Sequence, residues 1–346
     1  MVPEPPPTLR LDVDAAALAH NWRALDRLSG AAAAGAAVKA DCYGLGAARC
    51  VPVLRDAGAR DFFVAHWSEV PTVAAHIPPG NISVLHGALS AAEAQYAISA
   101  GVKPVINSLY QARLWLEAGG GACDLMVDSG MNRLGIRPEE AGDPLIASLR
   151  VDVLMSHLSS ADEDAPSNAR QLETLRALLP QVRHRRASLA NSAGLMLGPA
   201  YHLDLTRPGL ALYGGLPRAE LAGAIRPVAR VQAAIIQRRV VRAGETIGYN
   251  RTFTAQTDLP VGIVSLGYAD GFLRSWGKSG YLLKDDCRLP LVGRVSMDMV
   301  AVDLTRAPGL AEGDFLQVPF DLPPAAEATG LSQYELLTTL GRRFAR

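Results

Sequence analysis

Short runs rich in β-branched and apolar residues recur along the first two thirds of the chain, separated by segments rich in Ala, Leu, Arg and Glu. This alternation predicts parallel strands joined by helices. Eight such runs in roughly 200 residues match the eight units of a (β/α)8 TIM-type barrel. An open doubly wound sheet is the alternative. The runs are Ala36–Lys39, Phe62–His66, Ile82–His86, Pro104–Asn107, Asp124–Asp128, Val151–His157, Ala187–Asn191 and Leu203–Thr206.

Polar or reactive residues stand at or just after the ends of these runs. In a (β/α)8 barrel the C-terminal ends of the strands form the catalytic face, so this gathering favours the barrel. No Gly-x-Gly-x-x-Gly follows the first run, which disfavours a dinucleotide-binding fold. The residues are Lys39, His66, His86, Asn107, Asp128, His157, Asn191 and Arg207.

Lys39 ends the first apolar run and precedes the Gly-containing segment Ala-Asp-Cys-Tyr-Gly-Leu-Gly. An ammonium at the end of a buried strand loses hydration, so such a lysine is usually paired, deprotonated or covalently engaged. A covalently engaged lysine suggests Schiff-base chemistry. Taken alone, the position is explained equally well by a lysine that extends its side chain to solvent.

Beyond about residue 225 the pattern changes to alternating or continuous β-type runs that no long helix interrupts. It predicts an antiparallel β domain, closed by an amphipathic helix near Ser332–Arg343. We therefore predict a barrel domain over residues 1–226 and a β domain over residues 227–346. The β-type runs are Val228–Val241, Thr246–Phe253, Val261–Tyr268, Arg288–Asp303 and Phe315–Val318.

Composition indicates a small-molecule partner and a reducing compartment. Lys plus Arg and Asp plus Glu both number 34, so nothing in the formal charge favours a nucleic acid or an anionic membrane. The N-terminus has no apolar signal-peptide core, and the expected location is cytoplasmic. The cysteines lack Cys-x-x-Cys spacing, which argues against a zinc site and a disulfide framework, and we expect no metal. They are Cys42, Cys50, Cys123 and Cys287.

Seven blocks, taken together and in order, resemble alanine racemase, a pyridoxal-phosphate enzyme of fold type III. The blocks are AVKADCYGLG at Ala37, DSGMNRLG at Asp128, ANSAG at Ala190, RPGLALYG at Arg207, IGYNRTF at Ile247, LGYADG at Leu266 and GRVSMDM at Gly293. The resemblance covers nearly the whole chain. It implies a barrel followed by a separate β domain, pyridoxal 5'-phosphate as cofactor, and interconversion of L- and D-alanine by a head-to-tail homodimer.

The resemblance assigns cofactor attachment through a Schiff base to Lys39. Racemisation needs a base on each face of the substrate carbanion, and one lysine can serve only one face. The family pattern makes Tyr249 the opposite-face base, presented by the partner subunit. It also implies a hydrogen-bonded chain of His157 and Arg207 behind the tyrosine, with Arg207 facing the pyridine nitrogen. Without the blocks, a core histidine and a surface ion pair would explain these two residues as well.

The family pattern also implies a cradle for the cofactor phosphate. It consists of Ser192 next to Asn191, the backbone N–H groups of Gly209 and Leu210, and the hydroxyls of Tyr43 and Tyr334. The same residues permit a simpler interpretation, in which the Asn-Ser pair caps a helix and the glycine follows a turn-forming proline. Both can hold at once, because an N-terminal helical turn binds anions with its free N–H groups.

The resemblance implies that Arg133 and the N–H of Met297, the latter from the other subunit, hold the substrate carboxylate. Tyr268 would line the entrance. Arg133 could instead pair with a neighbouring carboxylate, and Asp270-Gly271 could be an ordinary turn. One departure stands out. Many relatives carry a carbamylated lysine seven residues before the arginine, where this chain has Met126, so a chloride or another carboxylate replaces it or Arg133 is held differently.

Three other functions remain open from sequence. A racemase of another small amino acid such as serine would share every block, because motifs do not report pocket shape. A barrel-type pyridoxal-phosphate decarboxylase would share cofactor and fold, but it typically needs a glycine-rich phosphate loop and a cysteine motif that this chain lacks. A single-barrel cofactor carrier would lack the β domain. The sequence leaves undecided whether D-alanine is made for peptidoglycan or alanine is catabolised.

Overall fold

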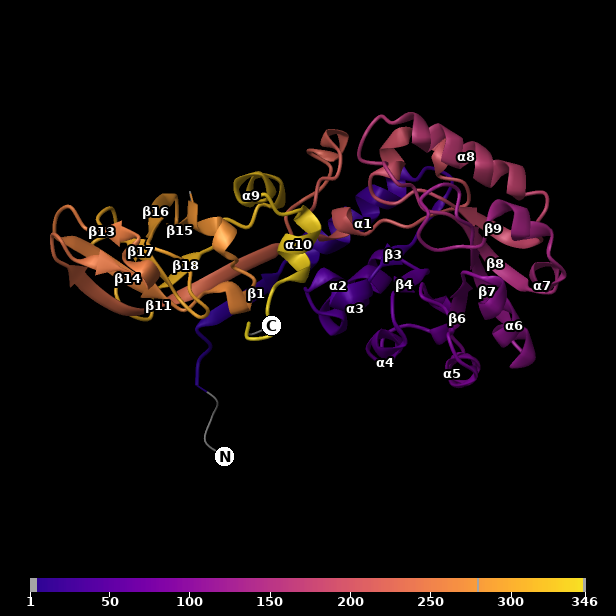
Figure 1. The fold of residues 1–346 in the computed structure, drawn as a ribbon, viewed down its shortest axis with the longest axis horizontal. Helices are drawn as coiled ribbons and strands as arrows, with labels where there is room; N and C mark the ends of the chain where they lie inside the picture. Colours follow the sequence, from indigo (N-terminus) through magenta and orange to yellow (C-terminus); the bar gives the residue numbers. More distant parts are fainter. Residues whose placement is uncertain (1–4, 279, 345–346) are drawn as a thin grey trace. The chain divides into compact units, whose positions relative to one another are not determined.

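The computed structural model describes residues 5–278 and 280–344. The chain divides into two compact units, each described by itself: one is Ala15–Arg226, and the other joins the segment up to Asp14 with Pro227 onward (Figure 1). The N-terminal segment therefore lies in a different unit from the one predicted. Its strand β1 (Leu9–Val13) pairs antiparallel with β11 (Ala229–Val241), more than two hundred residues later in the chain.

The Ala15–Arg226 unit is a barrel of parallel strands, which confirms the predicted fold class. Its hydrogen-bonded order is β2-β10-β9-β8-β7-β6-β5-β4-β3. Each of the eight predicted runs overlaps a strand. The strands are β2 (Ala33–Ala34), β3 (Ala36–Ala37), β4 (Phe62–Val64), β5 (Ile82–Val84), β6 (Lys103–Ile106), β7 (Ala122–Met126), β8 (Arg150–Met155), β9 (His184–Ser188) and β10 (Leu205–Thr206).

Gly35 lies where the barrel closes. It separates β2, which pairs with β10, from β3, which pairs with β4. The Gly35 N–H donates to Thr206 O at 2.9 Å, and the next N–H, that of Ala36, donates to Asp61 O at 2.8 Å. A Cβ on Gly35 would lie 3.0 Å from Asp61 O and 3.3 Å from Thr206 O. One short stretch of chain thus bonds to both of its neighbours, and only glycine leaves room for this.

The helices of this unit pack their apolar faces against the outside of the strands. In α1 (Ala15–Leu28) the buried side chains include Leu18, Trp22 and Leu25, the periodicity expected of a core-facing helix. A cluster of buried apolar residues joins helices to the outward-pointing residues of the strands, such as Leu125 and Leu154. The other helices are α2 (Lys39–Tyr43), α3 (Ala47–Ala57), α4 (Val70–Ala74), α5 (Ala91–Ala100), α6 (Leu109–Glu117), α7 (Pro144–Ala147) and α8 (Pro166–Leu178).

The barrel interior has a charged layer and an apolar layer. Alternate strand residues point inward, because successive side chains of a strand face opposite sides. Toward the start of the strands, Lys103 Nζ lies 2.6 Å from Asp152 and 3.8 Å from the fully buried Asp124. Further along are the apolar residues, which form a separate buried cluster next to the C-terminal strand ends. They are Phe63, Val105, Met126, Val153, Met155 and Leu205.

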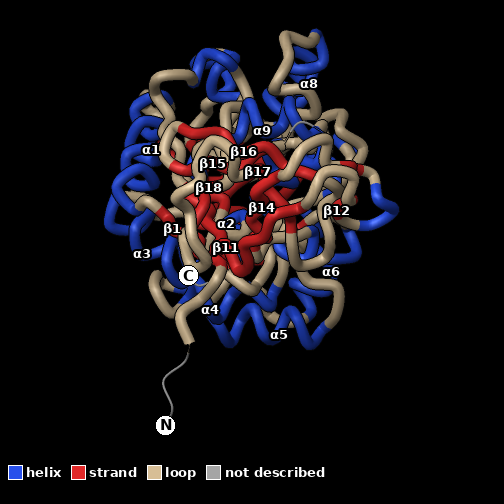
Figure 2. The backbone as a smooth tube through the Cα atoms, turned by 90° about the vertical axis from the view of Figure 1, so that its left-hand side faces the viewer, coloured by secondary structure: helices blue, strands red, loops and turns tan. Residues whose placement is uncertain are grey.

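The second unit is built on an antiparallel sheet, as predicted (Figure 2). Its order is β1-β11-β14-β17-β16-β15-β18, and β18 also pairs with β11, so the sheet curls back on itself. The predicted run Thr246–Phe253 is instead two short paired strands around a turn. The strands are β12 (Thr246–Ile247), β13 (Phe253–Thr254), β14 (Leu259–Val264), β15 (Tyr281–Lys284), β16 (Cys287–Val292), β17 (Val300–Asp303) and β18 (Phe315–Gln317).

Helix α10 (Gln333–Thr338) lies within the range Ser332–Arg343 where one helix was predicted, and another short helix, α9 (Leu322–Thr329), precedes it. Helix α10 begins as expected, because Ser332 caps it and Glu335 bonds back to the Ser332 N–H. It ends early, where the chain turns at Gly341. Across the described residues, no helix is both long enough and apolar enough to cross a membrane.

Asn21 ties helix α1 to the end of the barrel unit, and we expect its replacement to destabilise the fold. Its fully buried side chain donates to Leu212 O and Arg226 O and accepts from the Arg226 N–H at 2.8 Å. Asn21→Ala leaves these backbone groups unpaired and should lower the free energy of unfolding by about 2–4 kcal/mol. Urea denaturation followed by circular dichroism measures this. Arg23→Ala, on the exposed side of α1, is the matched control, and equal midpoints for the two variants would contradict the assignment.

Candidate active site

Lys39 follows β3 and begins α2 (Lys39–Tyr43), which is an unusual turn rather than a regular right-handed helix. The four residues that follow, Ala40–Tyr43, all have left-handed backbone conformations with φ of 53–55°. Such conformations cost non-glycine residues roughly 1–2 kcal/mol each. The surroundings must therefore hold the turn in place, and it fixes the direction in which the chain leaves Lys39.

Glu69 and Asp41 supply hydrogen bonds that hold this turn. The Glu69 carboxylate accepts the Ala40 N–H and also the N–H groups of Ala65 and His66 at 2.7 and 2.9 Å, which joins the ends of β3 and β4. The Asp41 carboxylate accepts the Ala47 N–H at 2.6 Å, at the start of α3. Sequence reasoning did not single out Glu69. The one feature of the sequence that points to Glu69 is that it stands three residues after His66, where its side chain can cap the following helical turn.

The environment of Lys39 favours an unprotonated amine. Burial lowers the pKa of Lys39 below its ordinary value of 10.5, and the positive charges of Arg133 and Arg207 lower it further, against the opposing effect of Glu69. An amine must be unprotonated to attack a carbonyl carbon, so this lysine is prepared for Schiff-base chemistry. The interpretation of Lys39 as a mere surface lysine does not account for this setting.

Ser192, Gly209 and Tyr43 meet in a compact cradle beside the barrel mouth. The Ser192 hydroxyl accepts the N–H groups of Gly209 at 2.9 Å and Ala211 at 3.2 Å. A Cβ on Gly209 would overlap the Tyr43 hydroxyl, so only glycine allows this approach. Leu210 begins a short 3-10 helix, and among the described residues its N–H has no hydrogen-bond acceptor. The Leu210 N–H, together with the hydroxyls of Ser192 and Tyr43, suits a phosphate.

Two further residues shape the cradle. Asn191 Oδ1 accepts the Gly194 N–H at 2.9 Å, so its side chain caps the turn after β9, which was the simpler of the two sequence interpretations. Tyr213, missed in the sequence despite its place in the RPGLALYG block, stacks on Tyr43 with ring centroids 4.8 Å apart and donates to Ala37 O at 2.9 Å. Tyr213 thereby holds Tyr43 against the end of β3.

Arg207 is buried at the end of β10 and is held by the neighbouring strands. Its guanidinium donates to the Ser188 hydroxyl and to Ser156 O. Burial lowers its pKa to about 10, so it stays cationic at neutral pH. Burial and the nearby charges of Arg207 and Arg133 lower the pKa of His157 to about 3, which leaves a neutral imidazole. Within the described residues the expected hydrogen bond between His157 and Arg207 is not formed, because Arg207 is engaged by the two serines.

Arg133 lies on an exposed loop that Asp128 organises. The Asp128 carboxylate accepts the N–H groups of Gly130, Met131 and Arg133 at 2.8–2.9 Å. Burial alone would raise the pKa of Asp128, but these N–H groups lower it below its usual range. Asp128 thus binds the backbone of Arg133, and among the described residues no carboxylate forms an ion pair with its guanidinium. The guanidinium is available for a ligand.

Met126 is buried in the apolar layer of the barrel interior and is only 6 % exposed. Its neighbours there include Phe63, Val105 and Met155. A charged carbamate in such surroundings would be strongly unfavourable. The methionine at this position thus fits its apolar surroundings, and the backbone N–H of Arg133 is bound by Asp128.

Tyr249, Tyr268, Met297 and Tyr334 all lie in the second unit. Tyr249 begins a tight turn after β12, is 65 % exposed, and borders a cavity of about 440 Å3 together with Arg294 and Ser296. Met297 and Tyr334 are also well exposed, at 52 % and 44 %. Exposed aromatic and apolar side chains of this kind suit contact with another surface.

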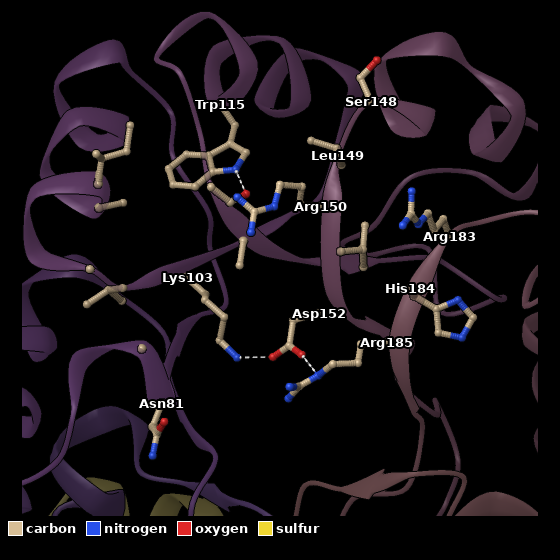
Figure 3. Close-up of a pocket in the computed structure, with 18 of the residues that line it drawn as sticks. Asn81, Lys103, Trp115, Ser148, Leu149, Arg150, Asp152, Arg183, His184 and Arg185 are labelled. Atoms are coloured by element: carbon tan, nitrogen blue, oxygen red, sulfur yellow. Dashed lines mark hydrogen bonds and ion pairs between the residues drawn. The ribbon is translucent and has the colours of Figure 1, made fainter.

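A cavity of about 1160 Å3 lies at the opposite end of the barrel, at the N-terminal ends of β6 to β9. Figure 3 shows Lys103 and Arg185 both reaching Asp152 there. None of the predicted site residues lines this cavity. The residues at the C-terminal strand ends are thus separate from this cavity, and the C-terminal face is where active sites of this fold lie.

The residues at the C-terminal strand ends fit pyridoxal 5'-phosphate. Lys39 offers an amine of lowered pKa for its aldehyde, and the cradle around Gly209 offers the Leu210 N–H and the hydroxyls of Ser192 and Tyr43 for its phosphate. A barrel of parallel strands with this pair of features, followed by an antiparallel β unit, defines the class of barrel-type pyridoxal-phosphate enzymes.

Comparison with known proteins narrows the class. The family model "Alanine racemase, N-terminal domain" matches residues 13–217, and "Alanine racemase, C-terminal domain" matches residues 228–346. The chain therefore belongs to the alanine racemase family, which confirms the resemblance seen in the sequence blocks. A biosynthetic alanine racemase of Agrobacterium fabrum is 40 % identical, covering 98 % of this chain and 93 % of the relative. An alanine racemase of Cereibacter sphaeroides is 43 % identical, covering 98 % and 97 %.

Solved structures of alanine racemases resemble this chain along its whole length. Alanine racemase from Bartonella henselae with covalently bound pyridoxal phosphate superposes with a TM-score of 0.90 at 31 % identity, covering 99 % of both chains. The biosynthetic alanine racemase from Pseudomonas aeruginosa gives a TM-score of 0.88 at 36 % identity, again covering 99 % of both.

The lowered pKa of Lys39 predicts a shifted pH dependence of cofactor attachment. The cofactor-free protein should take up pyridoxal phosphate with a rate that reaches half its maximum at a pH below 10.5, because the amine loses its proton earlier than a free lysine. Arg133→Met removes a positive charge and should move this midpoint upward. The measurement is the absorbance of the bound cofactor against time at each pH. Arg137→Met, on the same loop, is the control, and identical midpoints for Arg133→Met and the unaltered protein would contradict the electrostatic explanation.

Proposed function

We propose that this chain interconverts L- and D-alanine with pyridoxal 5'-phosphate, using Lys39 and Tyr249 as bases on opposite faces of the substrate. Membership of the alanine racemase family supports the overall reaction. The single observation that carries the chemistry is Lys39, an amine with lowered pKa at the end of a barrel strand, on the same barrel face as an anion cradle.

Bound pyridoxal phosphate would withdraw electrons from the α-carbon of the substrate and so acidify its α-hydrogen. The protein then has to remove that proton from one face and return one to the other. The Lys39 amine, once released from the cofactor, is the base on its own face. It is suited to this task because its lowered pKa keeps more of it unprotonated near neutral pH.

Tyr249 is proposed as the second base, supplied by the partner subunit of a homodimer. Its ring is exposed on the β unit, as a residue that completes a neighbouring site must be. A free tyrosine has a pKa near 10 and needs a partner that can share its proton. His157 suits this role, because its lowered pKa leaves a neutral imidazole able to accept a hydrogen bond.

Arg207 is proposed to face the ring nitrogen of the cofactor. A guanidinium with a pKa of about 10 keeps its protons at pH 7, so the ring nitrogen would stay unprotonated. Its position is well defined, since two hydrogen bonds to Ser188 and Ser156 leave the buried side chain little freedom. A weaker electron withdrawal by the cofactor limits transamination as a side reaction.

Arg133 and the Met297 N–H are proposed to hold the substrate carboxylate, and Tyr268 to line the entrance. The Arg133 guanidinium has no ion-pair partner among the described residues, while its backbone is fixed by Asp128. Ser192, the N–H groups of Gly209 and Leu210, and the hydroxyls of Tyr43 and Tyr334 are proposed for the phosphate, with Asn191 shaping the turn beneath them. We further propose a cytoplasmic enzyme that supplies D-alanine for peptidoglycan, in line with the relative described as biosynthetic.

The reaction can be tested by incubating L-alanine with the purified, cofactor-loaded protein in heavy water. We expect D-alanine to accumulate, with deuterium at the α-carbon, because the returned proton comes from a group in exchange with solvent. Chiral chromatography with mass spectrometry follows both products. Lys39→Ala should abolish activity and the absorption band of the lysine-bound cofactor. Release of carbon dioxide without inversion would select a decarboxylase, and faster turnover of L-serine would change the substrate.

Replacing Tyr249 by Phe should separate the two proton transfers. Racemisation should fall by about 100-fold or more, the usual effect of losing a general base. One enantiomer should still exchange its α-hydrogen with heavy water through Lys39, while the other should not. Proton nuclear magnetic resonance of each pure enantiomer measures this exchange. Wild-type exchange of both enantiomers would remove Tyr249 from the mechanism.

A further inference from the structure

We propose that Arg343, near the C-terminus, is a positioning residue that fixes the Tyr268 and Met297 segments for substrate-carboxylate binding. The inference rests on the proposed function of Met297 and Tyr268. Arg343 lies outside all seven sequence blocks. It is far along the chain from both segments, yet its guanidinium holds one carboxylate in each of them.

The guanidinium of Arg343 makes a forked contact with Asp270. Its Nε and Nη2 donate to the two oxygens of this carboxylate at 2.7 and 2.9 Å. Its remaining nitrogen, Nη1, donates to Asp298 at 2.7 Å. Asp270 directly follows the pair Tyr268-Ala269, and Asp298 directly follows Met297. One side chain thus bridges the turn that carries Tyr268 and the turn that carries Met297.

The Asp270 carboxylate passes this constraint to the backbone. Its Oδ2 also accepts the Gly267 N–H at 2.9 Å, which closes the turn around Tyr268. That turn bonds directly to the other one: the Tyr268 N–H donates to Ser296 O, and the Ala269 N–H donates to Met297 O, both at 3.0 Å. The Met297 N–H belongs to the same planar peptide as the Ser296 carbonyl, so the hydrogen bond from the Tyr268 N–H to Ser296 O fixes the orientation of the Met297 N–H.

Close packing leaves the two turns little freedom. A Cβ on Gly267 would overlap the Met297 carbonyl, and Gly271 has a left-handed φ of 88° with the Thr339 carbonyl close by. The Gly341 N–H donates to Asp270 O at 3.2 Å, so the chain after α10 lies on the same turn. The residues Gly267–Gly271, Ser296–Met299 and Gly341–Arg343 therefore form one block, which we call the carboxylate block.

Burial identifies the contact on which this block depends. Asp270 is 1 % exposed, whereas the side chains of Arg343 and Asp298 are about half exposed, at 48 % each. An exposed ion pair contributes little to stability. A buried carboxylate that loses an arginine bound to both of its oxygens is instead left with an uncompensated charge. The turn must then open to admit water or rearrange. Either response displaces the peptide that presents the Met297 N–H.

Loss of Arg343 should therefore raise KM more than it lowers kcat. The carboxylate of the substrate is held equally before and during proton transfer, and removing such uniform binding raises KM and leaves kcat nearly unchanged. For Arg343→Met we expect KM for alanine to rise about tenfold or more, the usual effect of losing a hydrogen bond to a charged group, with kcat within about threefold. Arg343→Lys keeps the charge but cannot bind both oxygens of Asp270 at once, so its KM should lie between the KM values of the unaltered protein and of Arg343→Met.

Arg342→Met is the matched control, because it removes the same charge one residue earlier, at an exposed side chain. All variants are assayed as cofactor-loaded full-length protein, with cofactor absorbance and melting temperature recorded alongside. Inhibition by propionate, which carries the substrate carboxylate without an amine, should weaken in parallel with KM for Arg343→Met. A wild-type KM and unchanged propionate inhibition in Arg343→Met would overturn the proposal, as would an equal effect of Arg342→Met.

Asp298→Asn keeps the test decisive if Arg343→Met does not fold. It removes only the exposed half of the bridge and should raise KM by a smaller factor than Arg343→Lys. An equal or larger effect would contradict the leading role given to Asp270. Failure of the proposed function would look different, because the unaltered protein would then not racemise alanine at all.

Discussion

The site depends on the way the barrel closes at Gly35. The short stretch around this glycine hydrogen-bonds to β10 on one side and to β4 on the other, which brings residues from the two ends of the barrel unit together. The Ala37 N–H donates to Pro208 O at 2.9 Å, two residues before Lys39 and one before Gly209. The amine proposed to bind the cofactor and the cradle proposed for its phosphate thus stand at adjacent strand ends, although about 170 residues separate them. A side chain at Gly35 would push these neighbours apart.

Charge and apolarity are distributed in layers along the barrel. The ion network of Lys103, Asp124 and Asp152 lies toward the start of the strands, and an apolar layer containing Met126 separates it from the strand ends. At the strand ends, Arg133 and Arg207 bring positive charge close to a neutral histidine. This excess favours anionic groups, and both the cofactor phosphate and the substrate carboxylate are anions. Met126 is apolar, and the backbone of the arginine loop is held by the Asp128 carboxylate.

The sequence predicted the barrel because its strand signals are local: each run is short, apolar and followed by a polar residue. The roles proposed for Lys39, Ser192 and Gly209 come from blocks whose order is specific to one family. The sequence could not predict that β1 belongs to the second unit, since strand pairing across more than two hundred residues leaves no local signal. Nor could it predict the left-handed run Ala40–Tyr43, because no glycine or asparagine marks it. The guanidinium of Arg207 donates to Ser188 and Ser156, which lie at the ends of different strands, and these bonds replace the expected hydrogen bond to His157. No local pattern in the sequence indicates such partners.

The left-handed turn after Lys39 has a consequence for anyone who uses this barrel as a scaffold. Protein engineers commonly replace irregular connections by idealised loops to gain thermal resistance. Here such a replacement would remove the backbone path that aims the reactive amine, together with the anchoring role of Glu69. This irregular connection should therefore be kept unchanged, and idealised loops should be introduced only at the N-terminal ends of the barrel strands.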